Sequence, residues 1–212
     1  MVTRSQQNLT EMKNIIVLLI LLIFPKIALA QTCLHKNLSK EFNFEVKKIK
    51  ISNETIDSNT VKVIVYNKIS NKKQEIKFGA NFLFEKTFIN CKAVRSYLTG
   101  INKDAEIIDN DFGDLIIADF NFDNLEDFAI KNDSGGNGGP TYNYYIQGKN
   151  KSFALDNFLT TEMEFFPSKF SIKNKRLITY VHANAYQLSE NTFEYNEKSK
   201  KWKYKQSRLV SF

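Results

Sequence analysis

The stretch VKVIVYNKISNKKQEIKF, from Val61 to Phe78, sets the expected fold class of this chain of 212 residues. Apolar side chains recur at alternate positions in both halves of the stretch, and a turn rich in Asn and Lys separates the halves. Alternation with a period of two is typical of a strand with one buried face, and two such runs around a short turn indicate an antiparallel hairpin.

Four further runs show the same alternation, and polar turns separate many of them. No glycine pattern that would bind a dinucleotide or phosphate follows any run. We therefore expect an all-β protein built as an antiparallel β-sandwich, with a short irregular propeller of β-meanders as the competing arrangement. A helix is expected only around 91–98. The four runs are Phe42–Val46, Leu177–Val181, Thr192–Tyr195 and Lys201–Tyr204.

The last of these runs allows two interpretations. Trp202 and Tyr204 alternate with three lysines, at positions 201, 203 and 205. A strand of this kind usually buries its aromatic side chains and keeps its lysines outward, where they protect a sheet edge. The alternative is a strip on which carbohydrate rings stack.

Residues 1–30 have the pattern of a secretory signal peptide. Lys13 precedes an apolar run from Ile15 to Phe24, and an Ala-x-Ala site ends at Ala30. Met12 would serve as a start equally well. The run is shorter than the roughly 20 residues that cross a bilayer. We expect cleavage rather than an uncleaved anchor, and a periplasmic or secreted protein without a membrane span.

The chain has two cysteines, Cys33 and Cys91. In an oxidising compartment they are expected to form one disulfide that ties the new N-terminus to the middle of the chain. A lipid on Cys33 is the alternative, but this cysteine does not directly follow a small-residue cleavage site.

Charge and motifs argue against two classes of function. The formal charge is +7, yet the segment from Asp104 to Asp127 carries nine acids and no Lys or Arg. A nucleic-acid binder would concentrate basic residues on one face, so no nucleic-acid partner is expected. His35 and His182 are isolated, and no catalytic serine or zinc motif is present, so we expect no enzyme activity.

An acidic loop follows the apolar run Leu115–Ala118 and precedes Phe128–Ile130. Side-chain oxygens recur at its first, third, fifth and ninth positions, and the carbonyl at its seventh position completes the set. This spacing lets a tight loop surround one hard cation, so we expect a structural calcium ion. The expected ligands are Asp119, Asn121, Asp123, Leu125 and Asp127.

The loop differs from an EF-hand, because Ile130 occupies the twelfth position and the flanking residues favour strands. It resembles the calcium-binding hairpin loops of integrin-type repeats. A solvated acidic turn without a metal is the alternative.

A glycine-rich stretch, NDSGGNGGPTYNYY from Asn132 to Tyr145, follows the acidic loop. The succession of "IADFNFDNLEDFAI" and "DSGGNGGPTYNYY" resembles a family of periplasmic immunity proteins. Those proteins neutralise peptidoglycan-cleaving effectors of antibacterial type IV secretion, and they are similar to periplasmic inhibitors of invertebrate-type lysozymes. The resemblance covers roughly 107–202.

The resemblance implies an exported inhibitor whose loop enters the cleft of a lysozyme-like cell-wall hydrolase. Carried over by position, the contact residues are Ser134, Gly135, Gly136 and Tyr142, with Tyr144 and Tyr145 either continuing the strand or lining the rim. Glycines let backbone N–H groups approach an acidic cleft, and tyrosines give a large contact area. The alternative is a surface loop between two strands, with its tyrosines packed on the core.

The chain beyond the signal peptide divides into an N-terminal β-rich region, 31–102, and a calcium-loop, inhibitor-like region, 103–212. We expect the two regions to form one continuous domain. The competing function is a calcium-stabilised adhesion or ligand-binding module. A repeat protein of that class would carry several acidic loops, whereas this sequence has one.

Overall fold

The computed structural model describes residues 32–53 and 56–211. The chain divides into two units, Met1–Ala30 and Gln31–Phe212, and the expected signal peptide lies outside the described residues. The described part is all-β, as predicted, with its strands in three sheets. None of the helices among these residues has the length and apolar character needed to cross a membrane.

The first sheet is antiparallel and follows the order of the chain. Its outer hairpin contains the stretch from Val61 to Phe78, where the side chains of Val61, Val63 and Val65 are buried on one face. The alternation in the sequence therefore predicted this hairpin correctly. The strands are β1 (Thr32–His35), β2 (Phe42–Asn53), β3 (Ile56–Asn67) and β4 (Lys73–Ala80).

The central sheet is mixed, since its first strand runs parallel to the second and the remaining pairs are antiparallel. Every side chain of Leu115–Ala118 is buried, because both faces of this sheet are covered. The strands are β5 (Val94–Ser96), β6 (Leu115–Ala118), β7 (Asp127–Gly136), β8 (Gly139–Gln147) and β9 (Phe153–Leu155).

The third sheet is antiparallel and consists of β10 (Lys169–Ser171), β11 (Arg176–Asn184), β12 (Gln187–Asn196) and β13 (Lys201–Ser211). Two short helical turns occur in the described chain, the π-helix η1 (Leu159–Met163) and the 3-10 helix η2 (Ile172–Asn174). The helix expected around 91–98 is absent from that part of the structure. The segment forms turns and β5 instead, and the prediction was wrong.

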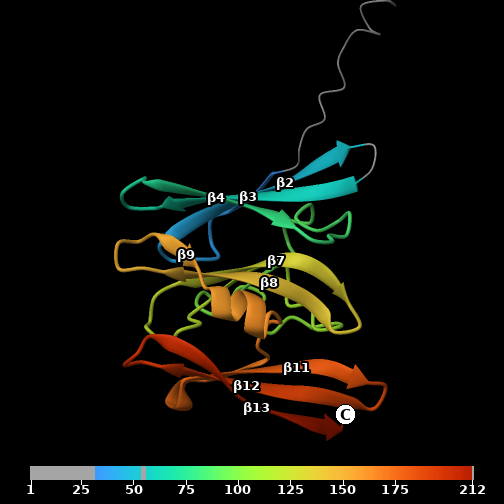
Figure 1. Ribbon diagram of the computed structural model, residues 1–212. Coiled ribbons are helices and arrows are strands. Elements are labelled where there is room, and N and C mark those ends of the chain that lie inside the picture. The colour runs from blue at the N-terminus through green and yellow to red at the C-terminus, as the bar shows by residue number, and fades with distance from the viewer. Residues whose placement is uncertain (1–31, 54–55, 212) are drawn as a thin grey trace, which may run out of the picture. The chain divides into compact units, whose positions relative to one another are not determined.

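Two hydrophobic cores lie on opposite faces of the central sheet, so the sandwich is three sheets deep (Figure 1). Alternate residues of β6 enter different cores: Leu115 and Ile117 pack with the first sheet, and Ile116 and Ala118 with the third. The first core also contains Phe42, Phe44, Val61, Val63, Phe128 and Phe153. The second contains Phe120, Tyr142, Tyr144, Phe166, Leu177 and Phe193.

The last strand, β13, forms an edge of the third sheet. Trp202 is buried against Phe122 and Tyr195, whereas Tyr204 is half exposed and contacts the ring of Phe193. The lysines of the strand are exposed. This arrangement matches the edge-protecting interpretation for Trp202 and leaves one face of Tyr204 in solvent.

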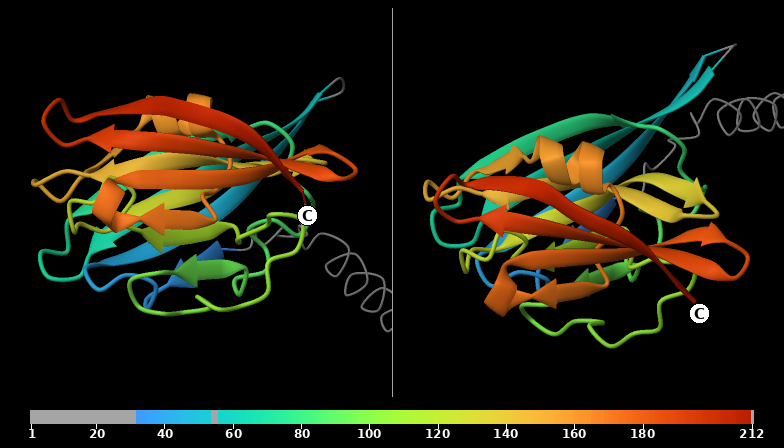
Figure 2. Two further views of the ribbon diagram at one scale, coloured as in Figure 1. Left: turned by 90° about the horizontal axis from the view of Figure 1, so that it is seen from below. Right: turned by 60° about the horizontal axis from the view of Figure 1, so that its bottom comes forward.

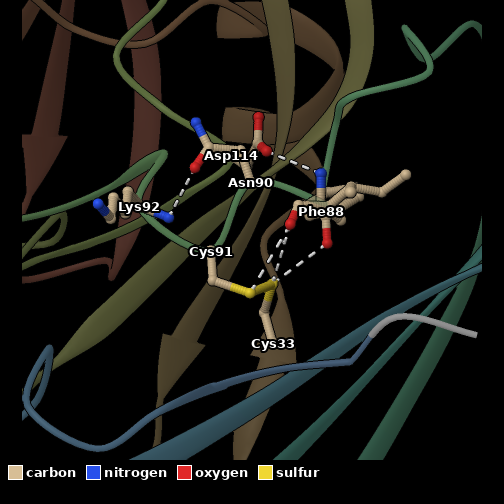
Figure 3. The surroundings of a disulfide bond; sticks show 7 residues. Cys33, Phe88, Asn90, Cys91, Lys92 and Asp114 are labelled. Carbon is tan, nitrogen blue, oxygen red and sulfur yellow. Dashed lines mark hydrogen bonds between the residues drawn. A yellow bond between two sulfur atoms is a disulfide. The ribbon is translucent and has the colours of Figure 1, made fainter.

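The predicted disulfide between Cys33 and Cys91 is present, with their Cα atoms 5.3 Å apart (Figure 3). It joins β1 to the segment that follows β4. The Cys33 Sγ lies 3.3 Å from the carbonyl oxygen of Phe88, and the Phe88 N–H donates to Asp114 Oδ2 at 2.8 Å. The disulfide therefore fixes this segment between the first sheet and the start of β6.

Candidate functional site

The acidic loop connects β6 to β7 and turns sharply through two residues with positive φ, Phe122 and Asn124. The carboxylate of Asp119 accepts hydrogen bonds from the N–H groups of Asp123 and Asn124, at 3.0 and 2.8 Å. Asparagine tolerates positive φ better than most residues that carry a side chain, so Asn124 suits this point of the loop.

Asp127 has no exposed surface and ends the loop. Its two carboxylate oxygens accept hydrogen bonds from the N–H groups of Phe120 and Gln147, each at 2.8 Å. Burial raises the pKa of Asp127 well above its ordinary value, and the charges of Asp123 and Asp119 act in the same direction. Burial also raises the pKa of Asp119. Of the three carboxylates, Asp127 is therefore shielded from water, whereas Asp119 is half-buried and Asp123 is exposed.

The donor atoms of this loop are carboxylate and amide oxygens, which are the ligands that calcium takes. In this structure, however, the Asn121 amide nitrogen donates to Asp123 Oδ2 at 3.0 Å, and the Asp123 Oδ1 accepts from Leu125 N–H at 2.9 Å. No group of three or more His, Cys, Asp or Glu side chains among the described residues is gathered around a common metal position. The calcium ion stays a prediction.

The glycine-rich stretch forms a β-hairpin, not a long loop. Strands β7 and β8 remain paired up to Gly136 and Gly139, and Asn137 and Gly138 alone make the turn. A Cβ atom on Gly135 would lie 1.9 Å from the carbonyl oxygen of Gly139, and Gly135 has φ of +70°. Glycine is therefore required at this position by both space and backbone conformation.

Tyr142 and Tyr144 have no exposed surface, and their rings pack in the second core. The Tyr144 hydroxyl donates to the carbonyl oxygen of Phe165 at 2.8 Å. These positions match the alternative in which the tyrosines pack on the core. A contact between either tyrosine and a partner's cleft would require this core to open.

Ser134 is also buried, with 6% of its surface exposed. Its N–H donates to the carbonyl oxygen of Phe82 at 2.6 Å, and its Oγ accepts from the N–H of Phe84 at 2.9 Å. Ser134 therefore holds the segment after β4 and does not reach outward. Of the residues expected to contact a partner, Gly136 is exposed and Gly135 is half-buried.

A hollow of about 540 Å³ lies beside the tip of this hairpin. It is lined by Gly136 and Asn137, by Asp109, and by His182–Ala185 at the end of β11 and the start of the following turn. The Asn110 side chain donates to the carbonyl oxygen of Tyr180 at 3.0 Å, which joins the loop before β6 to β11. The tips of the β7–β8 and β11–β12 hairpins project on the same side in every view (Figures 1 and 2).

Large apolar side chains flank this side. Phe82 and Phe84 are 56% and 57% exposed on the segment after β4, and Tyr186 is 81% exposed at the β11–β12 turn. Sequence reasoning missed these residues. Leu83 is as apolar as its two neighbours but is buried, so no pattern in the sequence separated the exposed rings from the core.

Comparison with known proteins gave one type of match. No family model matches the chain, and no curated protein matches it. A solved structure, described as that of a Xanthomonas type IV secretion system related protein, is similar with a TM-score of 0.50. The match covers 85% of this chain and 99% of that chain, at 14% identity. The chain thus shares its fold with a protein related to a type IV secretion system.

Proposed function

We propose that the chain is an exported inhibitor that binds and blocks a lysozyme-like peptidoglycan hydrolase through the tip of the β7–β8 hairpin. The observation that carries this proposal is the exposure of a tip with one side chain, Asn137, between Gly136 and Gly138. Backbone N–H groups at such a tip can approach a narrow cleft closely. Most glycoside hydrolases place a pair of carboxylates in that cleft, and backbone N–H and amide groups are suitable donors to them.

The tip is held in one conformation before any partner arrives. The Asp133 carboxylate accepts from the N–H of Gly135 at 2.7 Å, and a Cβ atom on Gly139 would lie 2.8 Å from the Asp109 carbonyl oxygen. The hairpin therefore rests directly on the loop before β6. A surface ordered in advance loses less conformational entropy on binding, which favours affinity.

Two further observations support an inhibitor of this class. The shared fold with a type IV secretion system related protein agrees with the resemblance found in the sequence. The disulfide between Cys33 and Cys91 is of the kind that persists in an oxidising compartment, where peptidoglycan hydrolases act. We also propose that the loop from Asp119 to Asp127 takes a calcium ion, which its carboxylate and amide oxygens would hold.

The proposal is tested by measuring peptidoglycan hydrolysis by a panel of lysozyme-like enzymes, with and without the mature protein. Gly136→Glu is the informative variant, because a Cβ atom there meets nothing within 4 Å. The added side chain and its negative charge should abolish inhibition without unfolding the protein. Gly79→Glu is the matched control, since Gly79 is exposed and equally free of neighbours.

Stoichiometric inhibition by the wild type and the control, lost in Gly136→Glu, supports the proposal. Equal inhibition by the two variants would show that the hairpin tip is not part of the interface. If the wild type inhibits no hydrolase yet binds calcium, the adhesion or ligand-binding module becomes the better explanation.

A further inference from the structure

Two phenylalanine rings on the segment after β4 are exposed to solvent and contact each other. The centroids of the Phe82 and Phe84 rings are 5.4 Å apart, with an interplanar angle of 87°. Leu83 between them is buried in the first core, which fixes the outward direction of both neighbours. Single exposed apolar residues are ordinary, but adjoining ones often mark a site of interaction.

The segment that carries these rings is fastened to the glycine-rich hairpin. Ser134 donates its N–H to the carbonyl of Phe82 and accepts the N–H of Phe84 at its hydroxyl, as described above. The N–H of Asn81 donates to the carbonyl oxygen of Asn132 at 3.0 Å. One strand, β7, thus positions both the phenylalanine pair and the hairpin tip.

Contacts from the first sheet hold the same segment as well. The Lys48 ammonium donates to the carbonyl oxygens of Phe84 and Glu85, at 2.9 and 2.7 Å. Thr87 and Phe88 are buried, and the carbonyl oxygen of Phe88 lies beside the disulfide. The rings are therefore presented by an ordered backbone, and their exposure does not come from a loose chain end.

We propose that Phe82 and Phe84 are the apolar anchor of the partner interface and that Ser134 is their positioning residue. This inference rests on the proposed function and assigns the anchor to the same hydrolase, which would offer an apolar pocket beside its cleft. The assignment to one partner follows from the geometry: Ser134 and Gly136 are two residues apart on β7, so a protein seated on the tip comes within reach of the rings. Aromatic side chains at the centre of an interface are typical binding hot spots.

The test is the inhibition constant of the mature protein against the hydrolase that it blocks. We expect each of Phe82→Ala and Phe84→Ala to weaken inhibition about tenfold, and the double variant at least about 100-fold. Ile69→Ala is the control, because Ile69 is 90% exposed but lies in the β3–β4 turn, which is on the opposite side from the β7–β8 turn (Figure 1). Circular dichroism and the unfolding midpoint would verify that the variants fold.

The role of Ser134 is tested by a double-mutant cycle. Ser134→Ala removes the acceptor for the N–H of Phe84 and should weaken inhibition in the wild-type background. In the Phe82→Ala/Phe84→Ala background it should weaken inhibition no further, because the side chains that it positions are gone. An equal loss in both backgrounds would overturn the positioning role.

The outcomes separate this inference from the proposed function. Loss of inhibition in Gly136→Glu with full inhibition by Phe82→Ala/Phe84→Ala would overturn the anchor and leave the inhibitor proposal intact. If the phenylalanine variants instead dissolve a dimer of the chain, seen by analytical ultracentrifugation, while inhibition is unchanged, the pair belongs to a self-association surface. A wild type that inhibits no hydrolase overturns both proposals.

Discussion

The ammonium group of Lys131 lies 2.9 Å from a carboxylate oxygen of Asp114, and both side chains are almost completely buried. Lys131 belongs to β7, while Asp114 lies just before β6 and also accepts the N–H of Phe88. The more exposed Asp111 contributes a second carboxylate to the same ammonium group. The charged pair therefore joins the central sheet to the segment fixed by the disulfide.

Removing the cation of this pair should be costly. In Lys131→Met, Asp114 remains buried without a compensating charge, and breaking a buried pair in this way destabilises a protein by about 3–5 kcal/mol. Urea unfolding of the variant, compared with Lys198→Met at an exposed position, measures the effect. Adding Asp114→Asn to Lys131→Met should recover part of the loss. Identical midpoints for wild type and Lys131→Met would contradict the burial of this pair.

The two neighbouring glycines of the hairpin should respond differently to alanine. In Gly135→Ala, a Cβ atom would clash with the carbonyl of Gly139, and the residue would also have a positive φ. We therefore expect the free energy of unfolding to fall by at least about 1–3 kcal/mol. Gly136→Ala meets no neighbour and should change stability by no more than about 0.5 kcal/mol. Thermal and urea unfolding of the two variants measure these changes. Equal stability of the two variants would contradict the conformation described for the tip.

Calcium should raise the unfolding temperature. Binding only to the folded state stabilises it by about 2.7 kcal/mol when calcium is at 100 times its dissociation constant, which corresponds to roughly 5–10 °C for a chain of this size. Differential scanning fluorimetry in calcium and in EDTA measures the shift. Asp123→Asn should abolish the shift, and Asp104→Asn, outside the loop, should keep it. A wild type without a shift would leave the loop as an acidic turn closed by its own hydrogen bonds.

Stability should fall in acid partly through Glu194. Hydrogen bonds from Lys205, Lys203 and Arg176 lower the pKa of Glu194 to about 2. A carboxylate whose pKa is depressed on folding contributes stability above its unfolded value of 4.5, and this contribution is lost as the pH falls toward 2. Urea midpoints of wild type and Glu194→Gln should therefore converge between pH 4.5 and 2. A constant difference between the two midpoints over that range would contradict the lowered pKa. High salt should reduce the difference at neutral pH, because Glu194 and its cationic partners lie near solvent.

The disulfide should contribute substantially to stability. It closes a loop between residues 58 apart, and the chain-entropy model assigns about 4 kcal/mol to a loop of this length. The Cys33→Ala/Cys91→Ala variant should unfold at a correspondingly lower urea concentration. The wild type in reducing buffer should behave like the variant, and no change in either case would show that the segment after β4 is held by its other contacts.

Patterns that depend on neighbours in the sequence were predictable. The alternation around Val61–Val65 predicted a strand with one buried face, because solvent covers the other face of the first sheet. The pairing of Cys33 with Cys91 followed from there being no third cysteine. The first prediction depends on neighbouring residues and the second on the number of cysteines, and neither requires knowledge of how distant segments pack.

The candidate site depended on contacts between distant segments, and there the sequence was less informative. Tyr142 and Tyr144 are buried because Phe166 and Leu177 cover that face of the central sheet, which no local pattern indicates. Similarly, the role of Ser134 became visible only when β7 was placed beside the segment after β4. The turn between Gly136 and Gly139 shortened an expected loop into a hairpin.

The position of the disulfide also determines when the segment after β4 becomes fully fixed. Cys91 follows Phe82 and Phe84 on one segment, and its bond to Cys33 fixes the far end of that segment. Synthesis and collapse of the strands can precede this bond, but the segment is fully fastened only after oxidation. A newly made chain under reducing conditions would hold its phenylalanine pair less firmly. Under the proposed function, the anchor formed by Phe82 and Phe84 would therefore be completed only by oxidation of this disulfide.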